Sequence, residues 1–495
     1  MNQIFRNLVI FEMANNHQGS VEHGLAIIEE LGKVTKKYGI NAAVKFQYRD
    51  LDTMIHPDYV GRTDVKHIPR FLSTRLSADQ FKTMVDAVRA NGMHTMCTPF
   101  DEKSVKLCCD HDIEILKVAS CSAVDWPLLE EVAKAGKPVI LSTGGKSFSQ
   151  IDNIYNFMTH RNVDFAMLHC VGLYPVGDEF VQLSCIDKMK SRYPGISIGY
   201  SGHENPKDFT VAQMAIAKGA EILERHIGLA TDEIKLNTYS TDAREVSGWI
   251  EAILRARTIC GKAEEKYLPK AELQSMDELA RGCYAKVAIK QGETITRDKV
   301  FFAMPCEGGQ TTSGLYLDSM VATKDYAANQ AIYEERPASP KAKLRGYIHD
   351  IKSQLSEARV VVPKDFNLEI SHHYGMENFD KYGCTLISVV NREYCKKILI
   401  MLPGQENPTH THKIKEETFQ ILSGTLDLTI EGVTHHLNPG EIYTVERFKP
   451  HSFSSVDGCV FEEISTTHAR NDSYYDDPSI QKLDPMDRKT ILTEW

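Results

Sequence analysis

The sequence predicts an α/β barrel, followed by a small β-rich module and an all-β barrel. Three observations support this: apolar runs alternate with amphipathic stretches up to about residue 260, turn signals separate strand-like runs over 281–338, and short alternating strands fill the rest. The chain has 495 residues, enough for two to four domains of about 150 residues. We expect domains at 1–270, 281–338 and 346–495, a linker over 335–343, and a polar surface tail from residue 471.

The first domain is predicted to contain eight parallel strands, each followed by a helical pattern. Helical spacing of apolar residues is clear over 77–92, which closes on a glycine, and over 208–220. Eight such units in about 260 residues match a TIM barrel, in which active-site residues lie at the carboxyl ends of the strands. The expected strands cover residues 8–14, 42–47, 93–100, 114–120, 138–144, 165–171, 196–202 and 220–227.

Composition and charge exclude several classes of protein. Hydrophobic residues make up 42% and charged residues 25%, as in globular proteins, and the net charge of −10 supplies no field to attract nucleic acid or an anionic membrane. No apolar run approaches the roughly 18 residues of a membrane helix, and the N-terminus lacks the pattern of a secretory signal. Twelve scattered cysteines without a CxxC pair favour a reducing cytoplasm.

Polar side chains late in, or just beyond, all eight predicted strands indicate an active site at the barrel mouth. Chance placement would explain one or two of them but not all eight. Lys45 and Lys117 with nearby hydroxyl groups would form a phosphate site. His203 and His226 could hold Mn²⁺ or a similar ion with open positions, and Glu224 shares the face of His226. The strand-end residues are Glu12, Lys45, Gln47, Thr98, Lys117, Ser120, Ser142, Thr143, His169, Ser201, His203, Glu224 and His226.

A second group of candidate metal ligands lies in the C-terminal region. His410 and His412, separated by one residue, share one face of a strand, and the carboxylate of Glu417 follows shortly. The distant His451 can complete a site of three imidazoles and one carboxylate around a divalent ion. Such ligands allow Zn, Fe, Mn, Co or Ni. The alternative, an exposed HxH on a surface loop, fits less well with the glycines that frame the motif.

The glycine framing of this group resembles the first motif of the cupin superfamily. That motif runs as a glycine, five residues, HxH, three or four residues, a glutamate, six residues and a glycine. Gly404, Glu417 and Gly424 satisfy the spacing around the HxH, whereas Glu416 does not. The resemblance implies a metal-binding β-barrel that acts as a sugar isomerase or epimerase, or that only binds a sugar and regulates the first domain.

The first domain resembles the sialic acid synthase family. The matching strings occur in the family's order as NNHQGS, AAVKFQ, CTPF, LKVASCSA, VILSTGG, MLHCVGLYP, IGYSGHE and ILERHI. The module at 281–338 is similar to the antifreeze-like (SAF) domain that follows this barrel in the family. The resemblance implies condensation of phosphoenolpyruvate with an N-acetylmannosamine-type or related aldose sugar, with release of phosphate and formation of a nonulosonic acid. It also implies a homodimer in which the antifreeze-like module covers the partner's active site.

The resemblance assigns a role to each matching residue. His203 and His226 would bind the metal, which would polarise the sugar aldehyde. Glu12 and Glu224 are both candidates for the acid/base or orienting carboxylate, beside the lysines at the reacting centre. Phosphoenolpyruvate would contact Lys45, Thr98, Lys117, Ser120, Ser142 and Ser201, and the sugar would contact Gln47, Tyr174 and Glu224.

Three departures from the family pattern bear on the substrate. Gly172 stands where the family often has asparagine, which removes one phosphate contact, and Gln18 stands where sialic acid synthases have glutamate or asparagine. Met304 replaces an arginine that is linked to sugar recognition. The loss of this arginine favours a sugar that lacks or relocates the acyl group.

Two other functions stay open. The chain could be a non-catalytic sugar-binding or coat-assembly protein, although such a protein would be expected to lose the lysines or histidines of the barrel mouth. It could also be another phosphoenolpyruvate-dependent ketoacid synthase that uses a phosphorylated sugar. That reaction needs a second basic cluster, for which Arg62, Arg70 or Arg75 could serve.

Overall fold

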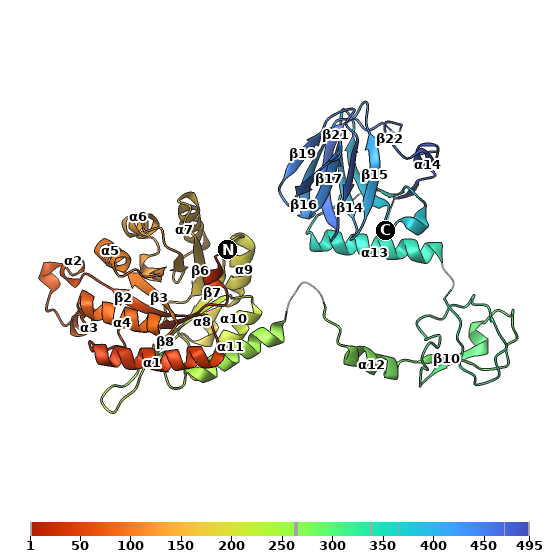
Figure 1. The fold of residues 1–495 in the computed structure, drawn as a ribbon. Coiled ribbons are helices and arrows are strands. Elements are labelled where there is room, and N and C mark those ends of the chain that lie inside the picture. The colour runs from red at the N-terminus through yellow and green to blue at the C-terminus, as the bar shows by residue number, and fades with distance from the viewer. Residues whose placement is uncertain (1, 262–265, 337–338, 365, 470, 494–495) are drawn as a thin grey trace. The chain divides into compact units, whose positions relative to one another are not determined.

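The structure is a computed structural model that divides the chain into two units, Met1–Lys266 and Tyr267–Trp495 (Figure 1). Within the described part of the chain, no helix has the length and apolar character needed to cross a membrane. The residues described are 2–261, 266–336, 339–364, 366–469 and 471–493.

Eight parallel strands form a closed barrel in the first unit. β1 pairs in parallel with both β2 and β8, so the sheet closes on itself. The two-residue strand β9 (Thr241–Asp242) pairs in parallel with the end of β8. The strands overlap all eight predicted segments, which confirms the predicted barrel. Their bounds are β1 (Val9–Glu12), β2 (Ala42–Tyr48), β3 (His94–Pro99), β4 (Ile115–Val118), β5 (Val139–Ser142), β6 (Phe165–Cys170), β7 (Ile198–Gly202) and β8 (Ile222–Gly228).

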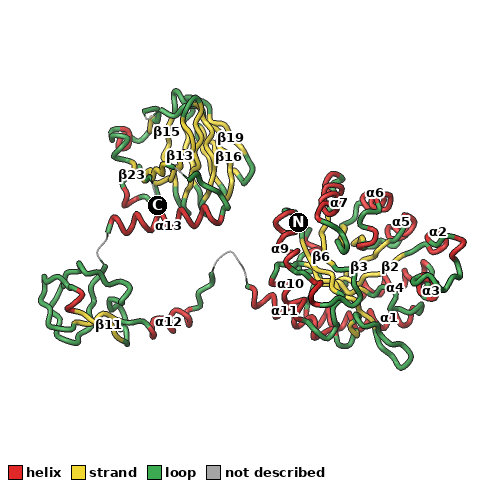
Figure 2. The backbone as a smooth tube through the Cα atoms, turned by 180° about the vertical axis from the view of Figure 1, so that it is seen from behind, coloured by secondary structure: helices red, strands yellow, loops and turns green. Residues whose placement is uncertain are grey.

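Helices surround the barrel strands, as Figures 1 and 2 show from opposite sides. The predicted helix at 77–92 is α4, which begins with a capping box in which Ser77 and Gln80 exchange side-chain and backbone hydrogen bonds. The helices are α1 (Val21–Tyr38), α2 (Leu51–Met54), α3 (Ile68–Ser73), α4 (Ala78–Ala90), α5 (Glu102–Asp110), α6 (Trp126–Lys134), α7 (Phe148–His160), α8 (Asp178–Val181), α9 (Ser184–Arg192), α10 (Thr210–Ala217) and α11 (Val246–Cys260). Short 3₁₀ helices are η1 (Gln3–Phe5), η2 (Pro57–Tyr59) and η3 (Ser120–Ser122).

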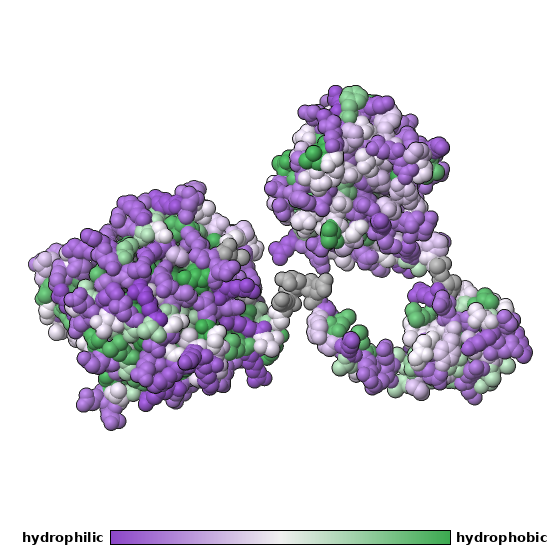
Figure 3. Space-filling model, in the orientation of Figure 1, coloured by the Kyte–Doolittle hydropathy of each residue, from purple (hydrophilic) through white to green (hydrophobic). Residues whose placement is uncertain are grey.

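Apolar side chains of the barrel strands pack on two sides. One set packs against the helices, and the other forms a separate cluster inside the barrel with Phe5 and Leu8. The inner cluster takes one residue from each of several strands, including Ile10, Ala43 and Ile115. The inner cluster therefore closes the barrel below the strand ends that carry polar residues. On the outside, the face of the unit seen in Figure 3 is mainly hydrophilic, with apolar residues in scattered groups.

The second unit begins with α12 (Lys270–Leu279) and a small module with its own core. Two antiparallel strands, β10 (Gly282–Ala285) and β11 (Val300–Ala303), pair in the module, which also contains η4 (Arg297–Lys299). Isolated bridges link further segments, and turns make up most of the rest. The core residues are Cys283, Ala285, Ile289, Ile295, Val300, Met320, Ala322, Tyr326 and Ile332.

The C-terminal region forms two antiparallel sheets, which confirms the predicted all-β domain. One sheet has the order β19-β16-β21-β14-β13-β12-β23 and the other β18-β17-β20-β15-β22. The strands are β12 (Asn367–His372), β13 (Gly383–Asn391), β14 (Tyr394–Met401), β15 (Glu406–Thr411), β16 (Glu417–Gly424), β17 (Leu426–Ile430), β18 (Val433–Leu437), β19 (Ile442–Val445), β20 (His451–Ser454), β21 (Cys459–Thr466), β22 (Tyr474–Tyr475) and β23 (Lys489–Leu492), with α14 (Pro478–Gln481) and η5 (Met376–Asn378) between strands.

Two segments differ from the sequence prediction. The expected linker at 335–343, of which residues 337–338 lie outside the described residues, is wrong in its second half because α13 (Pro340–Glu357) begins there. Ser339 caps that helix and Pro340 takes its first position, an arrangement that favours a helix start. The polar tail does more than cover the surface, because β23 pairs with β12 at the edge of the larger sheet.

Helix α13 packs on the larger sheet of the C-terminal region. Tyr347, Ile351 and Leu355 are buried in one cluster with residues of β12, β13, β14 and β21, and the Gln354 side chain donates to the Met401 carbonyl at 2.9 Å. The expected domain start at residue 346 therefore lies inside an element that belongs to this core.

We expect Ile351→Ala to lower the free energy of unfolding of the C-terminal domain by about 2–5 kcal/mol, since Ile351 is fully buried. Urea titration read by hydrogen exchange in peptides of β12 and β14 measures the loss, with barrel peptides as an internal reference. Ile442→Ala is the matched control, because the Ile442 side chain is 61% exposed and should cost under about 1 kcal/mol. Equal losses in the two variants would show that α13 is not part of the core.

Candidate functional site

The alternation of side chains along each barrel strand places the polar residues at the mouth. Successive strand residues face opposite sides, so residues two apart share a face. Glu12, Lys45 and Lys117 each follow an apolar residue of the inner cluster by two positions. Thr98, Ser142 and Glu224 follow Met96, Ile140 and Ile222 in the same way. The residues that fill the barrel thus fix the direction of the polar ones.

Four charged side chains meet at the mouth in a buried chain of ion pairs. Lys45 Nζ lies 2.5 Å from a Glu12 oxygen and 2.6 Å from Glu224 Oε1. Lys117 Nζ lies 2.6 Å from Glu224 Oε2, and the Ser201 hydroxyl donates to Glu224 Oε1 at 3.0 Å. All four charged side chains are at most 5% exposed. The structure thus brings the four predicted catalytic residues into direct contact.

The two lysines differ in how far their charge is compensated. Burial alone would lower the pKa of Lys45, but Glu12 and Glu224 outweigh it and raise the pKa above its ordinary value. Burial lowers the pKa of Lys117 to about 8, because Glu224 is its one contacting carboxylate and Lys45 repels it. Burial would likewise raise the pKa of Glu224, but the two lysines hold it below its ordinary range. Of the two lysines, Lys117 therefore has the charge that is less fully neutralised by carboxylates.

The two predicted metal-binding histidines lie side by side beyond these ion pairs. The rings of His203 and His226 have centroids 5.4 Å apart, and His203 Nδ1 donates to the Val171 carbonyl at 3.0 Å. Burial lowers the pKa of His203 to about 4 and that of His226 to about 3, so both rings are neutral at pH 7. The rings of Tyr174 and Tyr239 pack around the pair, with Tyr174 4.0 Å from His203. Two neutral imidazoles this close are suited to hold a divalent ion, which would keep open positions for a substrate.

The remaining predicted substrate residues occupy the same end of the barrel strands. Thr98 and Ser142 are buried, and the Ser142 hydroxyl has no hydrogen-bond partner among the described residues. The Ser120 hydroxyl accepts from the Gly144 amide at 2.9 Å, and the side-chain oxygen Oε1 of Gln47 accepts from the Arg49 guanidinium at 2.6 Å. An unpaired buried hydroxyl is costly, so Ser142 is the one best suited to receive a ligand atom.

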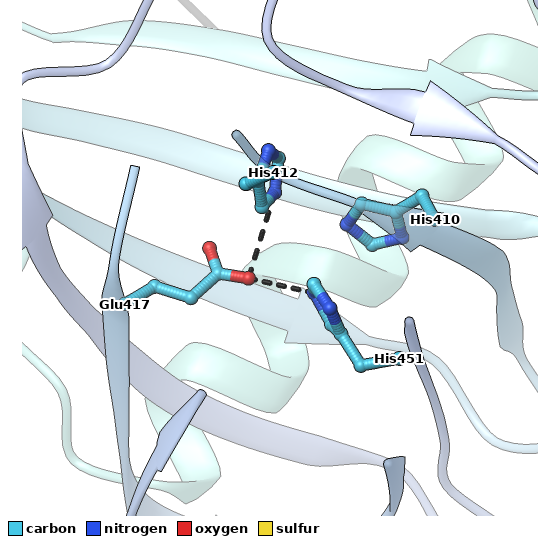
Figure 4. A group of neighbouring side chains, drawn as sticks. All are labelled: His410, His412, Glu417 and His451. Atoms are coloured by element: carbon cyan, nitrogen blue, oxygen red, sulfur yellow. Dashed lines mark ion pairs between the residues drawn. The ribbon is translucent and has the colours of Figure 1, made fainter. Parts of the chain in front are cut away.

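The C-terminal domain holds a cluster of four predicted metal ligands. His410 and His451 are register partners on β15 and β20, Glu417 begins β16, and His412 follows β15 (Figure 4). One ligand atom of each lies within 4.8 Å of all the others, and all four side chains are buried. Glu416 is exposed and lies outside the cluster.

The hydrogen bonds of the three histidines fix which nitrogen faces the centre. Each Nδ1 donates to a backbone carbonyl, at 3.0 Å for His410, 2.6 Å for His412 and 3.0 Å for His451. A carbonyl can only accept, so each Nε2 carries a lone pair. Glu417 Oε1 lies 2.7 Å from His451 Nε2 and 3.6 Å from His412 Nε2, yet these three atoms have no hydrogen-bond partner within the described residues. Converging lone pairs of this kind fit a divalent cation.

Charged neighbours hold the glutamate ligand in its ionised form. Burial would raise the pKa of Glu417, but the adjacent Lys415 holds it well below its ordinary value. Lys415 also contacts Glu463 at 3.0 Å. Asp472 accepts from the amides of residues 413–415, and its carbonyl accepts from His412 Nδ1. Asp472 thus shapes the loop between two ligands.

Comparison with known proteins identifies both domains. Residues 33–265 match the model of the NeuB family, and residues 397–461, which include all four clustered ligands, match the cupin domain model. The chain is 41% identical to a protein of Chromobacterium violaceum assigned as spore coat polysaccharide biosynthesis protein E, whose crystal structure aligns with a TM-score of 0.63 over 66% of this chain and 97% of that one. The chain belongs to the NeuB family.

Curated relatives of this NeuB-family chain include proteins named as synthases of N-acetylneuraminate 9-phosphate and of pseudaminic acid. It is 29% identical to N-acetylneuraminate-9-phosphate synthase of Mus musculus, over 59% of this chain and 81% of the relative. It is 26% identical to pseudaminic acid synthase of Campylobacter jejuni, over 66% of this chain and 95% of the relative.

Several residues of the two sites were missed by sequence reasoning. Tyr239 lies in the loop after β8, where no pattern marks an aromatic residue for the histidine pair. Asp472 lies in the segment expected to be a surface tail, but it is 2% exposed and bound to a ligand loop. Lys415 and Glu463 lie on the inner side of the cupin domain, where the alternation of β21 could have indicated Glu463.

Proposed function

We propose that this NeuB-family chain is a nonulosonic acid synthase that condenses phosphoenolpyruvate with an N-acetylmannosamine-type or related aldose and releases phosphate. The main support is the buried arrangement at the barrel mouth, in which two lysines and two glutamates lie beside a pair of neutral histidines. Curated relatives named as synthases of N-acetylneuraminate 9-phosphate, pseudaminic acid and N,N'-diacetyllegionaminic acid support the same chemistry.

The residues of the mouth divide the work in this proposal. Lys117, the less compensated cation, binds the phosphoenolpyruvate anion together with Lys45, Thr98, Ser120, Ser142 and Ser201. Glu224 stays ionised between the lysines and orients them, which leaves Glu12 as the carboxyl group that can hold a proton. Burial raises the pKa of Glu12 above its ordinary value, as an acid/base group requires. Tyr174 and Gln47 contact the sugar.

A divalent ion fits the pair of His203 and His226, since the Nδ1 hydrogen bond of His203 leaves its Nε2 lone pair available. Manganese or a similar ion bound there would polarise the sugar aldehyde. The side chains of this chain would place the acceptor against phosphoenolpyruvate, and Tyr174 and Tyr239 would limit access of water to that region.

Phosphate release from phosphoenolpyruvate with Mn²⁺ tests the proposal. The panel contains 2-acetamido, 2,4-diacetamido and unmodified mannose-type sugars, each free and 6-phosphorylated. We expect sugar-dependent release that is lost in His203→Ala and retained in the matched surface variant His436→Ala, whose side chain is 78% exposed. Absence of release with every sugar would favour the non-catalytic, sugar-binding alternative.

The 6-phosphorylated sugars in the panel test the alternative function, a phosphoenolpyruvate-dependent ketoacid synthase that uses a phosphorylated sugar. Of the three arginines that could bind a second phosphate, Arg62 pairs with Asp64 and Arg75 pairs with Asp52. Arg70 donates to Gln18 and to the Asn15 carbonyl at the edge of the mouth. We therefore expect the unphosphorylated acceptor to react better, and a preference for the 6-phosphate would point to Arg70.

The pH dependence of phosphoenolpyruvate affinity follows from Lys117. Its pKa of about 8 means that the ammonium form dominates below pH 8 and the neutral amine above it. We expect the Kd, measured by calorimetry, to rise by up to about tenfold per pH unit above pH 8. The substrate phosphate ionises near pH 6 and does not change over this range. Lys117→Met should abolish the dependence, and an unchanged wild-type Kd from pH 7 to 9.5 would contradict the assignment.

We further propose that the cupin domain is a metal-dependent sugar-binding domain that acts as an isomerase or epimerase, or regulates the barrel. The converging lone pairs of the histidine cluster support metal binding. The module over 281–338 is proposed as the antifreeze-like domain and the whole protein as a homodimer. Analytical ultracentrifugation tests the dimer, and a monomer at micromolar concentration would overturn it.

A further inference from the structure

A large cavity in the cupin domain connects the histidine cluster to a buried arginine. Its volume is about 840 Å³, and its lining includes His410, His412, Glu417, Tyr475 and Arg488. Such a volume is enough for a sugar-sized ligand rather than for a metal ion alone. The cavity therefore offers room beside the ligands for a substrate.

Arg488 is a buried cation that has no carboxylate partner among the described residues. Its side chain comes from the turn before β23, is 7% exposed by residue, and lines the cavity. Within the part of the chain that the structure describes, no carboxylate lies within ion-pair distance of its guanidinium, and its buried Nε has no hydrogen-bond partner. An unpaired buried charge is strongly unfavourable, so a guanidinium in this state is suited to an anion from outside the chain.

One aromatic ring joins Arg488 to the metal ligands. The guanidinium carbon lies 4.8 Å from the centre of the Tyr475 ring, and the same ring stacks on His410 with centroids 5.3 Å apart. The Tyr475 hydroxyl is hydrogen-bonded to His373 at 2.9 Å, which holds the ring in place. A single ligand of sugar size can therefore reach both Arg488 and the histidine cluster.

The buried charges of the cavity leave one positive charge in excess. Lys415 pairs with Glu417 and Glu463, and Lys397 lies 3.4 Å from Glu463. These two lysines balance the two glutamates, and Arg488 adds a further buried unit. Two partly exposed lining residues, Lys489 and Glu369, pair at 2.7 Å, and the exposed Asp484 also lines the cavity. A bound divalent ion would make the lining positive overall, which favours an anionic ligand.

We propose that this cavity binds a carboxylate-bearing sugar, with its carboxylate on Arg488 and its hydroxyl or keto oxygens toward the histidine cluster. The inference rests on the proposed sugar-binding role of the cupin domain and names its ligand class. One unpaired guanidinium matches the single charge and planar shape of a carboxylate. A phosphate monoester carries up to two charges and would need a second free cation. The product class of the proposed barrel reaction has such a carboxylate.

Calorimetry on the full chain, loaded with Mn²⁺, tests the inference with N-acetylneuraminate, its methyl ester and mannose 6-phosphate. The ester keeps the shape of the acid but removes its charge. We expect the acid to bind at least about 30-fold more tightly than the ester. In Arg488→Gln we expect the dissociation constant of the acid to rise by a similar factor. Arg447→Gln, at an exposed arginine of the same domain, should bind the acid like the wild type.

Two further variants separate this inference from the metal proposal. Arg488→Lys keeps the charge and should restore part of the affinity, which a folding defect would not allow. His410→Ala should reduce bound metal, whereas Arg488→Gln should leave metal content unchanged; equal metal content in wild type and His410→Ala would overturn the metal proposal instead. Equal binding of acid and ester, unchanged affinity in Arg488→Gln, no binding of the acid at millimolar concentration, or stronger Arg488-dependent binding of mannose 6-phosphate would each overturn the carboxylate assignment.

Discussion

Replacing Lys117 by methionine is expected to lower kcat/KM for phosphoenolpyruvate by about 10³-fold while the protein stays folded. Lys117 is the least compensated cation of the barrel mouth, so its charge is available to the substrate anion. Removal of Lys117 does not leave Glu224 without an ion-pair partner, because Lys45 remains 2.6 Å from the other oxygen of the same carboxylate. Phosphate release measures kcat/KM, and calorimetry measures the affinity for phosphoenolpyruvate. If both fall by the same factor, the variant has lost binding of phosphoenolpyruvate.

Two other lysine variants give this experiment its controls. Lys106→Met changes an exposed lysine of α5 and should leave kcat/KM within about twofold. Lys45→Met should instead destabilise the barrel by about 3–5 kcal/mol, since Glu12 would lose the one cation that contacts it within the described residues. Wild-type activity in Lys117→Met would refute the proposed role of Lys117, and unfolding of that variant would show that Lys45 alone cannot hold Glu224.

The barrel and its mouth were predictable because both obey the period of a β-strand. An apolar residue such as Ile115 and the polar Lys117 two positions later share one face, so the sequence that fills the barrel also marks its site. The ion pairs among Glu12, Lys45 and Glu224 were not predictable, since they depend on the register of β1 against β2 and β8. The lysines predicted as free anion-binding groups are therefore found paired with carboxylates.

In the cupin domain the metal ligands were predictable from local sequence spacing, whereas the residues around them were not. The HxH and glutamate ligands follow a fixed local spacing, and the sequence alone selects Glu417 over Glu416. Asp472 and Arg488 lie in a polar segment without apolar periodicity, and their burial results from chain segments that pair far along the sequence, such as β12 with β23. Helix α13 had a local signal in Ser339 and Pro340, which also fits a linker.

His451→Ala is expected to raise the dissociation constant of the cupin metal by more than about 100-fold, because loss of even an outer-sphere partner of a metal ligand costs 10–100-fold. Competition with a chelator in a His203→Ala background, which removes the barrel pair, measures the cupin site alone. The control His436→Ala removes an exposed histidine of the same domain and should bind metal like its parent.

The free energy of unfolding, measured with and without metal, then shows whether His451 is a metal ligand or only a packing residue. In the apo protein the His451 Nε2 lone pair faces the Glu417 oxygen at 2.7 Å without a hydrogen bond, so loss of this contact should cost little. Loss of the ring packing and of the Nδ1 bond to the Lys449 carbonyl is the same with and without metal. Metal at about 1,000 times its dissociation constant should add about 4 kcal/mol to the wild-type domain and much less to His451→Ala. A variant that is equally destabilised in chelator and in metal would identify His451 as a packing residue, whereas a difference confined to the metal-bound state requires that the converging lone pairs hold a cation.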